Sequence, residues 1–340
     1  MTRVLINSFL RRKALACSLV AALAPVGAFL AATPAAAQEA QFPTRPVTLI
    51  LPFTPGGVAD SVTRRMAERL TGLWKVPVLV DNKPGAGGNL GAGFVAKAEP
   101  DGYTLLVTVF DGLVITKAFA RKVGFDPSRD LVPVALPTRS TTVIVVNPSV
   151  PATDFRGLVA HAKAHPGKLN FGSNGMGSSY HLALEQLNAL AEIDIGHVPY
   201  KGSSQVMVDL IAGRLDATII TAFLAMPYVK DGKVKPIAIG SAERSPLLPG
   251  IATVVESGYP GYEASLSMGV FAPGGLPKPL IARINADIRK VMLEPELTKQ
   301  FLSEGTVVTN LSAEQVTDRF QKDVRALQDL IVRKNLKIDF

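Results

Sequence analysis

Three glycine-rich stretches could hold an anion, because each follows an apolar, strand-like run and precedes a helix-like run. They are Thr54-Pro-Gly-Gly57, Pro84-Gly-Ala-Gly-Gly88 and Ser173-Asn-Gly-Met-Gly-Ser178. A glycine turn at a helix N-terminus presents backbone N–H groups and a partial positive charge, which bind an anion without a charged side chain. In an open α/β sheet such loops gather at the carboxyl ends of the strands, where ligands bind. The three loops therefore predict a site for a small anion.

A structural interpretation of the same loops stands beside the functional one. A single glycine loop is most often only a turn, and Ser178 and Ser179 can cap the helix that follows. The two roles are compatible, because a capped helix keeps backbone N–H groups and a hydroxyl for a carboxylate oxygen.

The sequence contains no strong catalytic constellation. Ser173 lacks the glycine two positions before it that a nucleophile elbow needs. His161 and His165 are four residues apart, but no adjacent acid completes a metal site. Only Asp60 with His181 offers a titratable pair for an enzyme. We therefore expect no catalytic residues, no cofactor and no metal.

The first 37 residues have the pattern of an export signal. Four basic residues precede the apolar run over 14–32. Three alanines follow it over 35–37, and cleavage is predicted after Ala37. The export route, general secretory or twin-arginine, stays open. Cys17, the sole cysteine, lies in this leader, so the mature chain is expected to have neither a disulfide nor a thiol nucleophile.

The charge of the mature chain argues against a nucleic-acid partner. The whole chain has 36 basic and 28 acidic residues, and the leader holds four of the basic ones and none of the acidic ones. The remaining 32 basic residues exceed the acidic ones by only four, and they are evenly spread.

Strand-like and helix-like runs alternate along the mature chain, which is typical of an α/β protein with mostly parallel strands. The first strand is predicted over 47–51, and the helix after it places Val62, Met66 and Leu70 on one face. Further strands are predicted over 76–80, 104–109, 131–136, 141–146, 193–197, 217–220, 234–239 and 267–271, and helices over 153–165, 180–191, 204–212, 279–293 and 312–334.

Six motifs occur in order along nearly the whole mature chain. They are Leu51-Pro-Phe-Thr-Pro-Gly-Gly-Val-Ala-Asp60, Asn82-Lys-Pro-Gly-Ala-Gly-Gly88, Pro100-Asp-Gly-Tyr-Thr-Leu105, Gly175-Met-Gly-Ser178 with His181, Val198-Pro-Tyr-Lys-Gly202 and Ala272-Pro-Gly-Gly-Leu-Pro277. Together they resemble the Bug, or TctC-like, family of solute receptors that serve tripartite tricarboxylate transporters. The resemblance implies a two-lobed periplasmic binding protein (a Venus flytrap, type II-like), each lobe a mostly parallel sheet flanked by helices.

The resemblance also implies the boundaries of the lobes, the class of the ligand and the membrane partner. Lobe 1 would span 42–142 with 265–340, and lobe 2 would span 143–264. A small organic carboxylate would be gripped from both lobes, partly through water, and delivered to membrane permease subunits by a periplasmic monomer. The ligand-binding candidates are Phe53, Pro55, Gly56, Gly57, Asp60, Gly88, Phe110, Ser173, Gly175, Met176, Ser178, His181, Asp216 and Thr221.

The identity of the carboxylate stays open at this point. Thr54 and the pair Val58-Ala59 depart from the commonest family pattern where side chains would touch the distal part of the ligand. A dicarboxylate, an amino acid and an aromatic acid all remain candidates. Asp60 could complement the helix dipole, or contact an amino group or a water molecule. The alternatives to a transport receptor are an exported enzyme or a ligand sensor using the same cleft.

Overall fold

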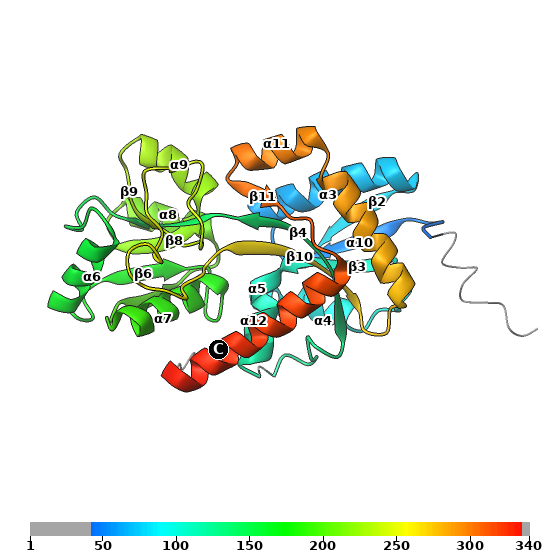
Figure 1. Ribbon diagram of the computed structural model, residues 1–340, viewed down its shortest axis with the longest axis horizontal. Coiled ribbons are helices and arrows are strands. Elements are labelled where there is room, and N and C mark those ends of the chain that lie inside the picture. Colours follow the sequence, from blue (N-terminus) through cyan, green and yellow to red (C-terminus); the bar gives the residue numbers. More distant parts are fainter. Residues whose placement is uncertain (1–41, 121, 335–340) are drawn as a thin grey trace, which may run out of the picture. The chain divides into compact units, whose positions relative to one another are not determined.

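The computed structural model describes residues 42–120 and 122–334, which form two β-sheets flanked by helices (Figure 1). The predicted export signal and its cleavage site lie outside the described residues. Within the described ranges, no helix combines the length and the apolar character that a membrane span requires.

The first sheet has six strands in the order β11-β4-β10-β3-β1-β2. β1 pairs in parallel with β2 and β3, whereas β10 is antiparallel to β3 and β4, and β11 is antiparallel to β4. β1 to β4 therefore point the same way in a mixed sheet. The bounds are β1 Val47–Leu51, β2 Val78–Asn82, β3 Thr104–Val109, β4 Leu131–Ser140, β10 Leu266–Pro273 and β11 Thr306–Val308.

The second sheet has five strands in the order β7-β6-β8-β5-β9. β6 is parallel to β7 and β8, and β5 is antiparallel to β8 and β9, so that β5 alone opposes the common direction. The bounds are β5 Thr142–Val146, β6 Asn170–Ser173, β7 Gly196–Pro199, β8 Ala217–Thr221 and β9 Lys235–Ile239.

Several elements differ from their predicted bounds. β4 runs to Ser140, four residues beyond its predicted end at Leu136. Its ladder with β10 is irregular there and skips from Thr138 to Ala135. Pro137 lies in this irregularity, where its missing N–H costs no ladder hydrogen bond. The strand predicted over 193–197 is found instead as β7, beginning at Gly196.

The helices cover the faces and edges of the two sheets. The final helix begins with the predicted capping box, because Ser312 N donates to Gln315 Oε1 (2.8 Å) and Gln315 N donates to Ser312 Oγ (3.3 Å). α5, α9 and α11 are not predicted from the sequence. The bounds are α3 Val58–Trp74, 3₁₀-helix η1 Ala86–Gly88, α4 Asn89–Val95, α5 Phe110–Ala118, α6 Phe155–Ala164, α7 Ser179–Ala191, α8 Ser203–Ile211, α9 Ala222–Lys230, α10 Lys278–Met292, α11 Pro295–Ser303 and α12 Ala313–Lys334.

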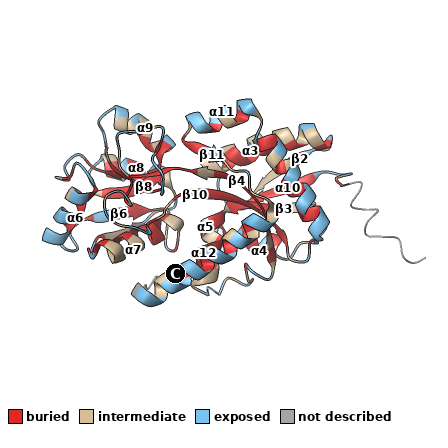
Figure 2. Ribbon diagram, in the orientation of Figure 1, coloured by how far each residue is buried: buried red, intermediate tan, exposed pale blue. Residues whose placement is uncertain are grey.

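Buried strands form the centre of both sheets (Figure 2). In the first sheet, Phe271 of β10 packs against Phe110 of α5 and Phe320 of α12, with ring centroids 5.8 and 5.9 Å apart. These three aromatic rings attach the C-terminal helix to the first sheet. Their packing explains why the chain returns to that sheet after completing the second.

The chain crosses between the sheets twice, and the two crossings lie side by side. β4 leads into β5 through Thr141, and the segment before Leu266 leads back into β10. The hydroxyl of Thr142 donates to the carbonyl of Ala264 at 2.6 Å, and the Thr141 N–H donates to the carbonyl of Gly305 at 2.9 Å. The lobe boundaries at 142/143 and 264/265 stay a prediction.

The aromatic contact generates a stability prediction. Phe271→Ala should lower the free energy of unfolding by about 3–5 kcal/mol, because it removes a buried ring that joins β10, α5 and α12. Urea unfolding followed by circular dichroism would measure the change. Val307→Ala on β11, where the side chain is 46% exposed, is the control and should cost far less. Equal losses would show that the ring contributes little to the core.

Candidate functional site

The first glycine turn lies open between β1 and α3. Gly57 is the N-cap of α3 with extended backbone (φ −85°, ψ 176°), and no side chain caps the helix. Gly56 has φ +90°, a conformation that favours glycine. A Cβ atom added at either position would meet no atom within 4 Å. The first turn of this 17-residue helix therefore faces open space with its partial positive charge.

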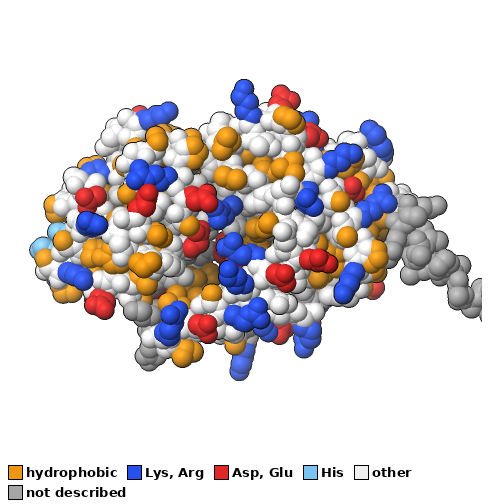
Figure 3. Space-filling view, viewed as in Figure 1, with side chains coloured by type: hydrophobic (Ala, Val, Ile, Leu, Met, Phe, Trp, Pro, Cys, Tyr) orange, Lys and Arg blue, Asp and Glu red, His pale blue; other side chains and the backbone are white. Residues whose placement is uncertain are grey.

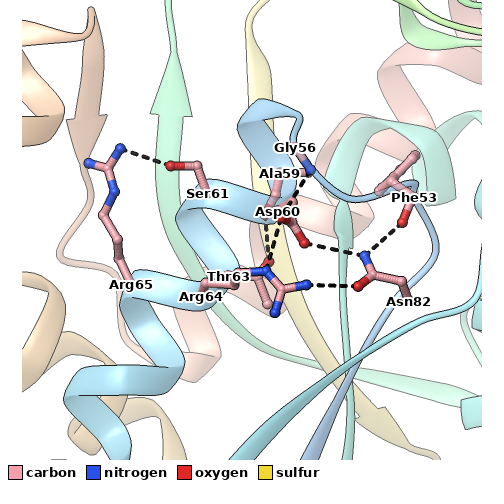
Figure 4. A network of polar contacts seen from close by, with 9 residues as sticks. All are labelled: Phe53, Gly56, Ala59, Asp60, Ser61, Thr63, Arg64, Arg65 and Asn82. Carbon is pink, nitrogen blue, oxygen red and sulfur yellow. Dashed lines mark hydrogen bonds and ion pairs between the residues drawn. The ribbon is translucent and has the colours of Figure 1, made fainter.

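A buried carboxylate holds this turn in place (Figure 4). Asp60, which is 6% exposed, accepts hydrogen bonds from Gly56 N (3.1 Å), Arg64 Nε (3.0 Å) and Asn82 Nδ2 (3.3 Å). Asn82 also donates to the carbonyl of Phe53 at 2.9 Å. In this conformation the Gly56 N–H is therefore directed at Asp60 rather than outward. Asp60 organises the loop, and its buried carboxylate is occupied by three protein donors.

The electrostatics of Asp60 agree with this role. Burial by itself raises the pKa of the carboxyl group, but the hydrogen bonds from Arg64, Gly56 and Asn82 outweigh it and lower the pKa below its ordinary value of 3.8. Asp60 is thus a carboxylate at neutral pH, and it is neutralised within the loop.

Two further candidates in the first sheet differ in their surroundings. Gly88, with φ +97°, lies against Phe53, since a Cβ atom there would be 3.7 Å from the Phe53 ring. Phe110 is 1% exposed, and its ring packs against Phe271 and Phe320 in the core. The side chain of Phe110 therefore supports the sheet, and the expectation that this side chain contacts a ligand is not supported.

The second-sheet loop joins β6 to α7. The Gly175 N–H donates to Ser173 Oγ at 3.1 Å, and the same hydroxyl lies 2.6 Å from His197 Nε2. Ser178 is the N-cap of α7 and accepts from His181 N at 3.2 Å. The loop is therefore pinned at both ends by serine hydroxyls. Met176 lies between these ends with 42% of its surface exposed.

Two stacked histidines support this loop from behind. His181 Nδ1 accepts from the Gly177 N–H at 3.0 Å, and its ring stacks on that of His197 with centroids 3.7 Å apart. Burial lowers the pKa of His197 to about 4, and the neighbouring His181 adds to the effect, so the His197 ring is neutral near pH 7. His181 is 4% exposed, and its ring nitrogens contact Gly177 of the same loop and Glu185 one turn along α7. The structure thus does not pair it with Asp60.

The two candidates on β8 lie at opposite ends of the strand. Asp216 accepts from Asn170 N at 2.8 Å, at the start of β6, whereas the glycine loop follows the end of β6. Because β6 and β8 are parallel, Asp216 is level with Asn170, three residues before the end of β6, or about 10 Å from the loop end at roughly 3.3 Å per residue. Asp216 therefore lies away from the loop, and this position does not support the expectation that it lines the cleft floor. Thr221 is the last residue of β8 and lies at the same end of the sheet as the loop after β6. It is 2% exposed, and its hydroxyl has no hydrogen-bond partner.

Sequence reasoning missed Arg64, Asn82 and His197. The spacing of Asp60 and Arg64, four residues apart on a helix, could have revealed the first of them. Asn82 and His197 lie on other elements of the chain. Asn82 begins one of the six motifs, but no local pattern indicates its contact with Asp60 or that of His197 with Ser173. Across residues 42–120 and 122–334, no cluster of three or more acidic or histidine side chains is placed to hold a metal ion.

Comparisons with known proteins fit this geometry. The family described as "Tripartite tricarboxylate transporter family receptor" matches residues 62–336. Protein BugT of Bordetella pertussis is 32% identical over 307 residues, covering 88% of this chain and 94% of its own. The solved structure of R. palustris Rpa4515 with adipate is 30% identical with a TM-score of 0.79, covering 87% of this chain and 99% of its own. MatC (Rpa3494) from Rhodopseudomonas palustris with bound malate is 29% identical with a TM-score of 0.77, covering 85% and 100%.

The Asp60 network generates a pH-dependent prediction. Asp60→Asn should lower the free energy of unfolding by about 1–2 kcal/mol at pH 7, because the ionised acceptor of three hydrogen bonds is lost. The depressed pKa means that this stabilisation is present above pH ~4 and is lost as the pH falls through the folded-state pKa. Urea unfolding at pH 7 and pH 3 would measure it.

Glu68→Gln, on the exposed face of the same helix, is the matched control and should change little at either pH. A deficit in Asp60→Asn that is as large at pH 3 as at pH 7 would contradict the assigned role of the charge.

Proposed function

Because this chain belongs to the tripartite tricarboxylate transporter receptor family, we propose that it captures a small organic carboxylate between its lobes and delivers it to the membrane permease. The family membership and the two-lobed fold confirm the resemblance drawn from the sequence motifs. The chain is accordingly a receptor rather than an enzyme, and its family consists of periplasmic binding proteins.

The observation that carries the proposal is the open turn at Gly57. Together with the loop from Ser173 to Ser178 it forms what we term the clamp. Each half of the clamp ends at the N-terminus of a helix, α3 with 17 residues and α7 with 13. A helix N-terminus carries roughly half an elementary positive charge. Two such termini and their backbone N–H groups suit a carboxylate, whose negative charge they can share.

The neighbours support the chemical class of the ligand. One structure contains adipate and another malate, both of them carboxylates. Around the clamp, Phe53, Met176 and Thr221 are the side chains that we propose to contact the ligand. Asp216 and the ring of Phe110 are left out of this site for the geometric reasons given above.

The leader and the family support export and delivery. We propose that the export signal over 1–37 is removed near Ala37 and that the mature chain works as a periplasmic monomer. We further propose that lobes over 42–142 with 265–340 and over 143–264 close by bending at the two crossings, which would bring Gly57 and Ser178 onto one ligand.

Calorimetric titration of the mature protein with a panel of carboxylates would test the function. The protein would first be unfolded and refolded to remove copurified ligand, and the panel would include adipate, malate, amino acids and aromatic acids. At least one acid should bind with a 1:1 stoichiometry. Absence of heat and of thermal stabilisation across the whole panel would argue against a carboxylate receptor.

A bulky residue in the open turn should block the ligand and spare the fold. Gly57→Val should weaken carboxylate binding by at least about tenfold, because its side chain would fill the space in front of the α3 amides. Its backbone angles suit valine, and no atom lies within 4 Å of the new Cβ. Titration with the acid found in the panel would measure the loss.

Gly250→Val, at another open glycine, is the control and should bind normally. Equal affinities for the wild type and Gly57→Val would show that the turn does not contact the ligand.

The unpaired hydroxyl of Thr221 offers a second test. Thr221→Val keeps the shape of the side chain and should reduce carboxylate affinity about fivefold to tenfold through one lost hydrogen bond. Thr138→Val on β4 removes the other buried, unpaired hydroxyl of the described chain and serves as the matched control. If both variants weaken binding equally, the effect comes from the surrounding structure rather than from contact with Thr221.

A further inference from the structure

A cavity of about 300 Å³ lies between α5, α7, α12 and the segment 261–267 that leads into β10. The clamp residues do not line it, although Ser179, directly after the clamp, does. Figure 3 shows a hollow near the middle of the face drawn there, with acidic and basic side chains gathered around it. In Figure 1 the three helices lie below the strands β4 and β10.

Asp111, in the first turn of α5, supplies the carboxylate of this cavity. Its Oδ2 accepts a hydrogen bond from Ser267 N at 3.1 Å, and the half-buried side chain lines the cavity. Burial raises the pKa of Asp111 to about 7, and the nearby Asp323 adds to the rise. The carboxyl group thus lies in surroundings where a cation would stabilise its charged form.

The other charged groups around the cavity leave Asp111 without a cationic hydrogen-bond partner among the described contacts. Arg319 Nε donates to Asp323 at 2.5 Å, so the two α12 side chains neutralise each other. Glu263 accepts from Ala242 N (2.9 Å) and Ser265 N (3.3 Å). Three carboxylates, those of Asp111, Glu263 and Asp323, therefore line the cavity together with two guanidinium groups, the half-buried one of Arg319 and the exposed one of Arg333.

Apolar side chains form the remaining walls. They come from three helices, namely Val114 and Ile115 of α5, Leu182 and Ala183 of α7, and Leu327 and Leu330 of α12. The volume is at the lower end of the range for small-molecule sites. A short aliphatic chain would therefore fit against these walls with a charged end near Asp111.

We propose that this cavity is a second ligand site, which binds a small organic cation made of a primary ammonium group on a short aliphatic chain. The ammonium group forms a charge-assisted hydrogen bond with Asp111, and the chain packs between α7 and α12. An anion is disfavoured because it would face three carboxylates at close range. The residues that line this site are different from those of the carboxylate clamp.

Three compounds of matched size would test the site on the purified mature protein at pH 8. n-Butylammonium chloride should bind saturably and raise the melting temperature. n-Butanol has the same chain without the charge, and sodium chloride supplies the ionic strength. Equal shifts with all three, or no saturable binding of n-butylammonium by calorimetry, would overturn the proposal.

Two variants locate the binding. Asp111→Asn keeps an oxygen for the Ser267 N–H and should weaken n-butylammonium binding about tenfold or more. Ala326→Phe adds bulk at an exposed residue of the cavity wall and should also abolish binding without changing a charge. Asp318→Asn, on the exposed face of α12, is the control and should bind like the wild type. Unchanged affinity in both cavity variants would refute the site.

The pH dependence gives an independent readout. Asp111 must be ionised to bind an ammonium group. The charged or titratable groups around it are Arg319, Asp323 and Arg333 of α12, Tyr180 of α7, and Glu263 in the segment before β10. Affinity should be full at pH 8 and fall below pH 7, approaching tenfold per pH unit. Affinity equal at pH 8 and pH 5.5 would contradict the role of Asp111.

Discussion

The hydrogen bonds to the carboxylate of Asp60 fix the first glycine turn, and the arrangement of the site depends on that turn. A turn of four residues that contains two glycines is flexible by itself, and its N–H groups could point in many directions. The Asp60 carboxylate links Gly56 to Arg64 and, through Asn82, to Phe53 at the end of β1. The turn is thereby ordered before any ligand arrives. Binding then loses less conformational entropy, which favours affinity.

The second loop is ordered by serine hydroxyls and histidine rings rather than by a buried carboxylate. Ser173, His197 and His181 form a chain of hydrogen bonds and ring stacking behind the glycines, and the low pKa of His197 keeps its ring uncharged. An acidic side chain, Glu185, also lies behind this loop, 3.5 Å from His181 Nε2. The two halves of the site are thus built differently: hydrogen bonds to a buried carboxylate order one, and serine hydroxyls and stacked rings order the other.

Local patterns in the sequence were sufficient for most of the fold and for the position of both loops. Glycine turns after apolar runs located the ends of β1 and β6, and the Ser312 capping box located the start of α12. The ring of Phe110 lies in the core, and no glycine or proline marks the junction at which β3 passes directly into α5. Asp216 lies just before β8, and sequence position alone does not say which end of a strand faces the ligand. The link between Asp60 and Asn82 spans 22 residues, and only the parallel pairing of β1 and β2 brings them together.

The two adjacent crossings also determine the order in which the chain can fold during synthesis. All five strands of the second sheet come from one uninterrupted stretch that ends at Ile239, whereas the first sheet needs β10 and β11 and is covered by α12. The second sheet can therefore close while the ribosome is still adding the C-terminal hundred residues or so. Until then β3 and β4 lack the strand that lies between them, and their edges stay unpaired. The first sheet therefore stays incomplete until synthesis of the chain is nearly finished.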